Sequence, residues 1–145
     1  MNLNHVNRSN TFMVRLPHGC DLAEELTAIC MRAGITLGEV RAIGAVQKAC
    51  IAFYDQQERV YKSKSFNHPL EIAQLTGNIS MKDGKPFIHA HVTLTDEDGN
   101  AFGGHLAAGT IVFACETVID VFDGPSLERS FDEQTGLGLW GVPNE

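Results

Sequence analysis

The chain has little positive charge, since 11 lysines and arginines stand against 18 aspartates and glutamates and the formal net charge is −7 at pH 7. Proteins that bind nucleic acid without sequence preference use lysines and arginines to displace counterions from the phosphates. No cluster of basic residues offsets the deficit in this sequence. The composition therefore argues against a protein whose main ligand is nucleic acid.

Long apolar runs are also missing, because no segment approaches the roughly 20 apolar residues that a helix needs to cross a bilayer. The first residues, 1–7, lack the basic and apolar regions of a secretory signal peptide. Cysteine is sparse and forms no Cys-x-x-Cys pair, so we interpret all four as reduced structural residues: Cys20, Cys30, Cys50 and Cys115. The sequence predicts a cytoplasmic protein without membrane contact.

Two common kinds of functional loop are absent as well. The early glycines Gly34, Gly38 and Gly44 match neither a phosphate-binding loop nor the elbow that carries a nucleophilic serine. There is no repeat, linker or low-complexity segment, and 145 residues are the length of one ordinary domain. We expect a flexible leader over residues 1–9 and a single domain over residues 10–145.

One helix is well signalled near the start of the chain, over residues 21–33. Asp21 is a suitable N-cap, and Gly34 stands where a C-terminal cap glycine belongs. Leu22 and Leu26 begin an apolar stripe on one face of this helix.

The rest of the chain consists of short β-branched or aromatic segments separated by turn residues, which indicates strands. The expected strands are 11–16, 39–46, 48–54, 59–66, 70–80, 87–95, 101–106 and 110–122. The continuous apolar character of the last one indicates burial on both faces, and residues 129–140 read as an irregular tail. One helix followed by strands, without βαβ alternation, predicts an α+β fold with a mostly antiparallel sheet.

Half of the six histidines lie in one stretch of 20 residues, Phe87 to Leu106. Residues alternate between apolar and polar from Phe87 to Thr95, so His89 and His91 point to the same face of a strand. An acidic stretch with a glycine, residues 96–100, predicts a chain reversal. A hairpin about this turn places His105 opposite His91 or one position diagonal to it, within reach of a shared ion.

Three imidazoles with an open fourth position are a ligand set that suits zinc holding water or a substrate oxygen. Gly103 and Gly104 leave room beside His105, as glycine often does where a ligand approaches a strand. The alternative is that His89, His91 and His105 are merely packed and hydrogen-bonded to carbonyls or to one another. The turn geometry supplies an independent argument for the metal site.

These segments resemble a known family. The run His89-Ala90-His91-Val92, the acidic turn and Gly103-Gly104-His105-Leu106 are similar to the PPC domain, the plants-and-prokaryotes-conserved domain, also catalogued as a domain of unknown function. The resemblance extends from the Leu16-Pro17-His18-Gly19 turn almost to the end of the chain. Leu70-Glu71-Ile72 looks like the family's Phe-Glu-Ile-Leu segment, although Pro69 stands where plant members carry an arginine.

The resemblance implies an α+β fold with a largely antiparallel sheet, assembled as a homotrimer, and we expect a stand-alone member. In plants the domain is fused to AT-hook segments that bind DNA, and bacterial members are often labelled DNA-binding for that reason. This sequence has no Arg-Gly-Arg-Pro core of an AT-hook. The fold also resembles that of acetolactate decarboxylase, a zinc enzyme with a His-x-His pair and a later histidine.

The leading functional hypothesis is a metal-binding trimer whose zinc binds or acts on a small molecule, by polarising a carbonyl or lowering the pKa of a bound water. Glu71 and Glu116 are candidate acids or bases because both sit in otherwise apolar strand sequence, although edge carboxylates paired with lysines are the commoner explanation. The alternatives are a DNA-associated regulatory module and a purely structural trimer.

Overall fold

The computed structural model describes residues 3–141, which form one helix and nine strands. The elements are β1 (Asn7–Leu16), α1 (Leu22–Ala33), β2 (Gly38–Asp55), β3 (Val60–Phe66), β4 (Leu70–Lys82), β5 (Lys85–Thr95), β6 (Ala101–Leu106), β7 (Ile111–Asp123), β8 (Glu128–Asp132) and β9 (Leu137–Trp140). The predicted α+β class is confirmed, and β4–β8 is the one parallel pairing among the described strands. No helix in this part of the chain is long and apolar enough to cross a bilayer.

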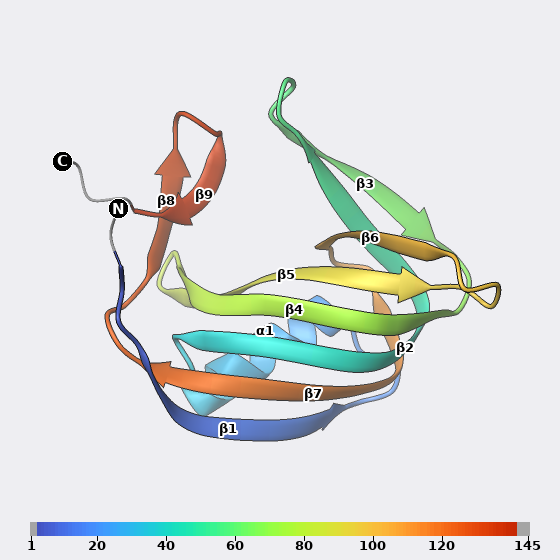
Figure 1. Ribbon diagram of the computed structural model, residues 1–145, viewed down its shortest axis with the longest axis horizontal. Coiled ribbons are helices and arrows are strands. Elements are labelled where there is room, and N and C mark those ends of the chain that lie inside the picture. Colours follow the sequence, from blue (N-terminus) through green and yellow to red (C-terminus); the bar gives the residue numbers. More distant parts are fainter. Residues whose placement is uncertain (1–2, 142–145) are drawn as a thin grey trace.

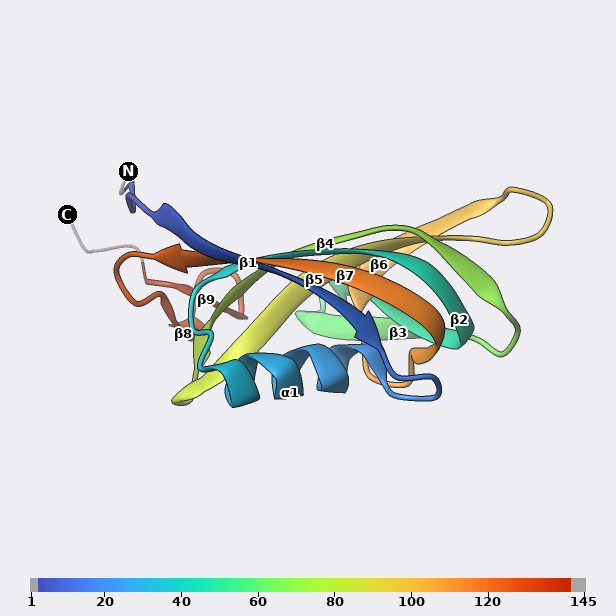
Figure 2. The same cartoon turned by 90° about the horizontal axis from the view of Figure 1, so that it is seen from below.

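All nine strands belong to one sheet with the order β1-β7-β2-β6-β5-β4-β8-β9, and β3 pairs with β2 off this path. Strand β2 also pairs with β4, so β2, β4, β5 and β6 form a closed circuit of neighbours. Helix α1 covers one face of the sheet (Figure 2). The β2–β3 and β8–β9 hairpins project from the sheet (Figure 1).

The core lies between α1 and the sheet. Leu22, Leu26 and Cys30 on the helix are fully buried, as are Leu75 on β4 and Leu94 on β5. The caps predicted for α1 are both present. The Asp21 carboxylate accepts hydrogen bonds from the first-turn amides, and Gly34 adopts a left-handed conformation with φ of 67°. Burying each large side chain stabilises the fold by about 1.5–3 kcal/mol.

The opposite, outer face of the sheet carries the histidines. Cross-strand partners run in register from Arg41 on β2 to Thr76 on β4, then to His91 on β5 and His105 on β6. Ala42, the neighbour of Arg41, belongs to the buried core, so side chains of the opposite parity point away from α1. The sheet therefore gathers these histidines on the face that α1 leaves open.

Strand β2 differs from the sequence prediction, which divided it into 39–46 and 48–54. The segment is one 18-residue strand, Gly38–Asp55. Its pairing with β7 shifts register around Val46 and Lys48, so an irregularity in a continuous strand replaces the expected break. The first half of β2 lies between β7 and β4, and its second half pairs with β3.

The tail prediction is wrong as well. Residues 129–140 fall largely in the β8–β9 hairpin, where the Asp132 carboxylate accepts hydrogen bonds from the Thr135 amide and hydroxyl, and Gly136 has φ of 76°.

Strand β1 begins at Asn7, so the last three residues of the expected 1–9 leader belong to the sheet. Met1 and Asn2 lie outside the described residues.

The burial predicted for both faces of residues 110–122 is also wrong for this chain. Phe113, Ala114 and Glu116 on β7 are exposed, while Val112 and Ile119 are buried. The apolar continuity of this segment therefore includes side chains that lie on the outer surface of the sheet.

Candidate metal centre

The β4–β5 hairpin positions the first two histidines. Asp83 and Gly84 form its turn with φ of 52° and 71°, as the Asp-Gly signal predicts for a tight hairpin. In the resulting register His89 pairs with Asn78 and His91 pairs with Thr76. Alternation along β5 then directs both imidazoles to the outer face.

The β5–β6 hairpin supplies the third histidine. In its turn the Asp96 carboxylate accepts hydrogen bonds from the backbone amides of Asp98 and Asn100, and Gly99 has φ of 79°. The resulting register pairs His91 directly with His105. This confirms the first of the two placements that the sequence allowed for His105.

The three imidazoles converge. His89, His91 and His105 each offer a ligand nitrogen, and these atoms all lie within 4.8 Å of one another. The ring centroids are 5.1 Å apart for His89 and His105, 5.4 Å for His89 and His91, and 5.6 Å for His91 and His105. His91 is exposed and the other two are partly buried, so the cluster can be reached from outside.

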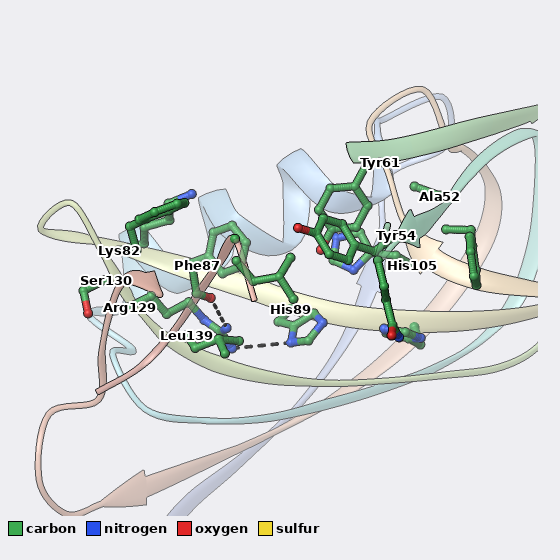
Figure 3. A pocket seen from close by; sticks show the side chains of 18 of the residues that line it. Ala52, Tyr54, Tyr61, Lys82, Phe87, His89, His105, Arg129, Ser130 and Leu139 are labelled. Atoms are coloured by element: carbon green, nitrogen blue, oxygen red, sulfur yellow. Dashed lines mark hydrogen bonds between the residues drawn. The ribbon is translucent and has the colours of Figure 1, made fainter. Parts of the chain in front are cut away.

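The cluster opens into a cavity of about 970 Å³. Side chains of the histidine strands and of the two projecting hairpins surround this cavity (Figure 3). Hydrogen bonds connect the two hairpins that border this cavity. Tyr54, near the end of β2, donates to the Thr135 carbonyl, and Arg59 donates to the carbonyls of Glu133 and Gln134. The lining also includes residues from β3, β6 and the β8–β9 hairpin, among them Tyr61, Gly103, Gly104, Arg129 and Leu139.

Arg129 on β8 is a charged lining residue that sequence reasoning missed. Its Nη2 lies 3.5 Å from His89 Nδ1, and the two residues are 40 positions apart in the chain. No local motif marks Arg129, because it lies in the segment that reads as an irregular tail. Only the parallel pairing of β8 with the end of β4 carries it to the histidines.

Two of the histidines, His89 and His105, are held in a form that suits metal binding. Burial lowers the pKa of His89 from 6.5 to about 4, with further lowering by the charge of Arg129 and by His105 and His91. Burial also lowers the pKa of His105, again with contributions from His91 and Arg129. Both imidazoles are therefore neutral at pH 7, and each keeps a lone pair for a cation.

The candidate acids lie elsewhere. Glu71 and Glu116 are exposed and line a different hollow on the outer face, together with Arg15 and Ile43, and none of the three clustered histidines lines this hollow. The structure thus brings the predicted metal ligands together but does not bring the predicted acids to them. The catalytic role of Glu71 and Glu116 stays a prediction that this geometry does not favour.

The fold and the site together place this protein in a class of α+β proteins. A mostly antiparallel sheet is covered by one helix, and its open face carries three clustered histidines. The model of the Plants and Prokaryotes Conserved (PCC) domain matches residues 4–123, and the chain belongs to this family. The resemblance carried by the sequence is thereby confirmed.

Solved structures share the fold along nearly the whole chain. A metal-containing protein from Archaeoglobus fulgidus is 44% identical with a TM-score of 0.93, and the match covers 98% of this chain and 100% of that one. A plant- and prokaryote-conserved protein from Pyrococcus horikoshii is 32% identical with a TM-score of 0.92, over 100% of both chains. A candidate DNA-binding protein from Bacteroides thetaiotaomicron is 27% identical with a TM-score of 0.85, over 97% and 98%.

A curated relative is much longer. The bifunctional protein GlmU of Synechococcus sp. (strain JA-3-3Ab) is 31% identical over 124 residues, which are 85% of this chain. The chain spans only 18% of the length of that relative.

Proposed function

We propose that His89, His91 and His105 bind one divalent metal ion, zinc in the first instance, and that the ion takes a small molecule from the adjoining cavity. The observation that carries the proposal is the approach of three ligand nitrogens to within 4.8 Å of one another. Neutral imidazoles are ligands that zinc prefers, so the donor set fits the ion. The similarity to a metal-containing protein of Archaeoglobus fulgidus supports this assignment.

The metal would supply one kind of chemistry, the polarisation of a substrate oxygen at a coordination position that the three histidines leave open. The chain supplies the surroundings. Tyr61 lies against His105 with ring centroids 5.1 Å apart, which limits the freedom of that imidazole. A cavity of about 970 Å³ accepts a molecule of metabolite size.

We further propose a cytoplasmic homotrimer. The outer face of the sheet exposes apolar side chains that a partner subunit would cover, including Met13 at 83%, Ile43 at 58% and Phe113 at 58% exposure. All four cysteines are unpaired, as expected in a reducing compartment.

Metal analysis of tag-free protein tests the metal proposal. We expect about one equivalent of metal per chain in the wild type and severe loss in His91→Ala. His68→Ala is the matched control, because His68 is exposed, its Nδ1 lies 3.2 Å from the neighbouring Pro69 carbonyl oxygen, and it does not line the cavity beside the cluster. Equal metal content in all three proteins would contradict the proposal, and it would favour packed histidines in a structural trimer.

A DNA-associated role is the second candidate, and it is supported by similarity to candidate DNA-binding proteins of Bacteroides thetaiotaomicron and Ralstonia eutropha. The net charge of −7 opposes it, because few phosphates can be neutralised against the field of the protein itself. The metal site is therefore the preferred assignment.

A further inference from the structure

Arg129 is a buried cation in the cavity beside the histidines. It is only 8% exposed, and no carboxylate in residues 3–141 lies within 4.0 Å of its guanidinium nitrogens. Its firm hydrogen bonds go to neutral acceptors: Nε donates to Ser80 Oγ at 2.9 Å, Nη1 to the Gly138 carbonyl at 3.0 Å and Nη2 to Asn78 Oδ1 at 2.7 Å. A buried charge without a counter-ion is costly, so an anion beside this side chain would stabilise it.

The aromatic contacts of Arg129 keep its charge at the cavity wall. Its guanidinium carbon lies 5.2 Å from the ring centroid of Phe87 and 5.4 Å from that of Trp140. Lys82 also lines the cavity, and Asp83 is the one carboxylate in this lining within the described chain. The cavity is thus locally cationic in a protein whose formal net charge is −7.

Metal binding would leave one donor of Arg129 without its acceptor. A neutral imidazole has one lone pair and one N–H, and a metal takes the lone pair. If the metal binds Nδ1 of His89, that lone pair is used; if it binds Nε2, Nδ1 carries the hydrogen. In both cases Nδ1 can no longer accept from Arg129 Nη2, which lies 3.5 Å away.

We propose that the cavity binds a small carboxylate, which Arg129 holds beside the metal site. The inference rests on the proposed metal site and names the class of its ligand. The carboxylate accepts the hydrogen bond that Arg129 Nη2 can no longer donate to His89. Its negative charge also offsets the added positive charge of the ion. Metal and carboxylate therefore bind cooperatively, each raising the affinity of the other by the same factor.

The test measures the zinc dissociation constant of tag-free protein, by competition with a chromophoric chelator, in acetate, in acetamide and in neither. Acetamide has nearly the same shape as acetate but no charge. We expect acetate to tighten zinc binding about tenfold or more, the size of one charge-assisted hydrogen bond, and acetamide to have no effect.

Arg129→Gln should retain zinc and lose the acetate effect, while Arg129→Lys, which keeps the charge but not the fork of donors, should retain part of it. Arg32→Gln is the matched control, because Arg32 is an exposed arginine on α1 that pairs with Glu25 and does not line the cavity. Circular dichroism verifies the fold of each variant.

Two failures are distinguishable. Zinc that binds the wild type and is lost in His91→Ala, with equal dissociation constants in acetate and acetamide, overturns the carboxylate inference alone. An undiminished acetate effect in Arg129→Gln overturns it too. Wild-type protein that binds no zinc, or binds it equally well in His91→Ala, overturns the metal site and the carboxylate inference together.

Discussion

Gly104 lies where strand β6 approaches strand β2, one residue before His105. A Cβ added to Gly104 would lie 2.8 Å from the Ala52 carbonyl oxygen and 3.3 Å from the Ile51 Cβ. A Cβ added to the neighbouring Gly103 would meet the Val92 carbonyl oxygen at 3.4 Å and nothing closer. The two glycines are therefore a matched pair, since Gly104→Ala crowds the backbone of β2 and Gly103→Ala does not.

The expected magnitude follows from these contacts. Crowding of this kind typically costs about 1–3 kcal/mol. Replacing glycine by alanine also restricts the unfolded chain, which offsets about 0.4–1 kcal/mol. Gly104→Ala should therefore lower the free energy of unfolding by about 1–2 kcal/mol, or Tm by roughly 2–8 °C for a domain of this size. Gly103→Ala should be neutral or slightly stabilising.

Thermal melts of the metal-free variants, followed by circular dichroism, measure this difference. Because β6 must shift away from β2 to relieve the contact, His105 moves with it, and Gly104→Ala should also weaken zinc binding about tenfold or more. Equal Tm values and equal zinc affinities in Gly103→Ala and Gly104→Ala would refute the idea that close approach of β6 to β2 positions His105.

Three further outcomes are expected. In metal-free protein the pKa of His89 is lowered from 6.5 to about 4, so between these values the unfolded state binds more protons and the free energy of unfolding falls as pH drops. The free energy of unfolding should be about 1 kcal/mol lower at pH 5 than at pH 7, after discounting for the partial exposure of His89. Denaturant titrations at the two pH values measure this difference. An equal difference in His89→Asn would contradict the assignment to His89. Sedimentation velocity at micromolar concentration should give a trimer, and a monomer would refute the assembly. Binding to duplex DNA should vanish at ~0.15 M salt, so tight binding under those conditions would overturn the charge argument.

The histidine cluster could be predicted from patterns of residues close together in the sequence. Alternation along Phe87–Thr95 places His89 and His91 on one face, and the acidic turn sets the register that pairs His91 with His105. These are short-range properties, because strand parity and hairpin turns depend on neighbours in sequence. The caps of α1 at Asp21 and Gly34 were predictable for the same reason.

Other features carried weaker local signals. The Asp132 to Gly136 turn has the residues of a tight hairpin, but the strands on either side are only five and four residues long. Short strands do not show a convincing period, so 129–140 read as irregular. The segment from Gly38 to Asp55 contains a register irregularity, which is indistinguishable in sequence from a break between two strands.

The sequence by itself determined the α+β class, the helix with its caps and the three histidines that share one face of a hairpin, because each depends on residues close together in the chain. Tertiary structure alone decided what surrounds them. It joined β8 to β4, which brought Arg129 within 3.5 Å of His89, and it placed Glu71 and Glu116 in a separate hollow. Such placements depend on pairings between distant strands, whose partners no local pattern specifies.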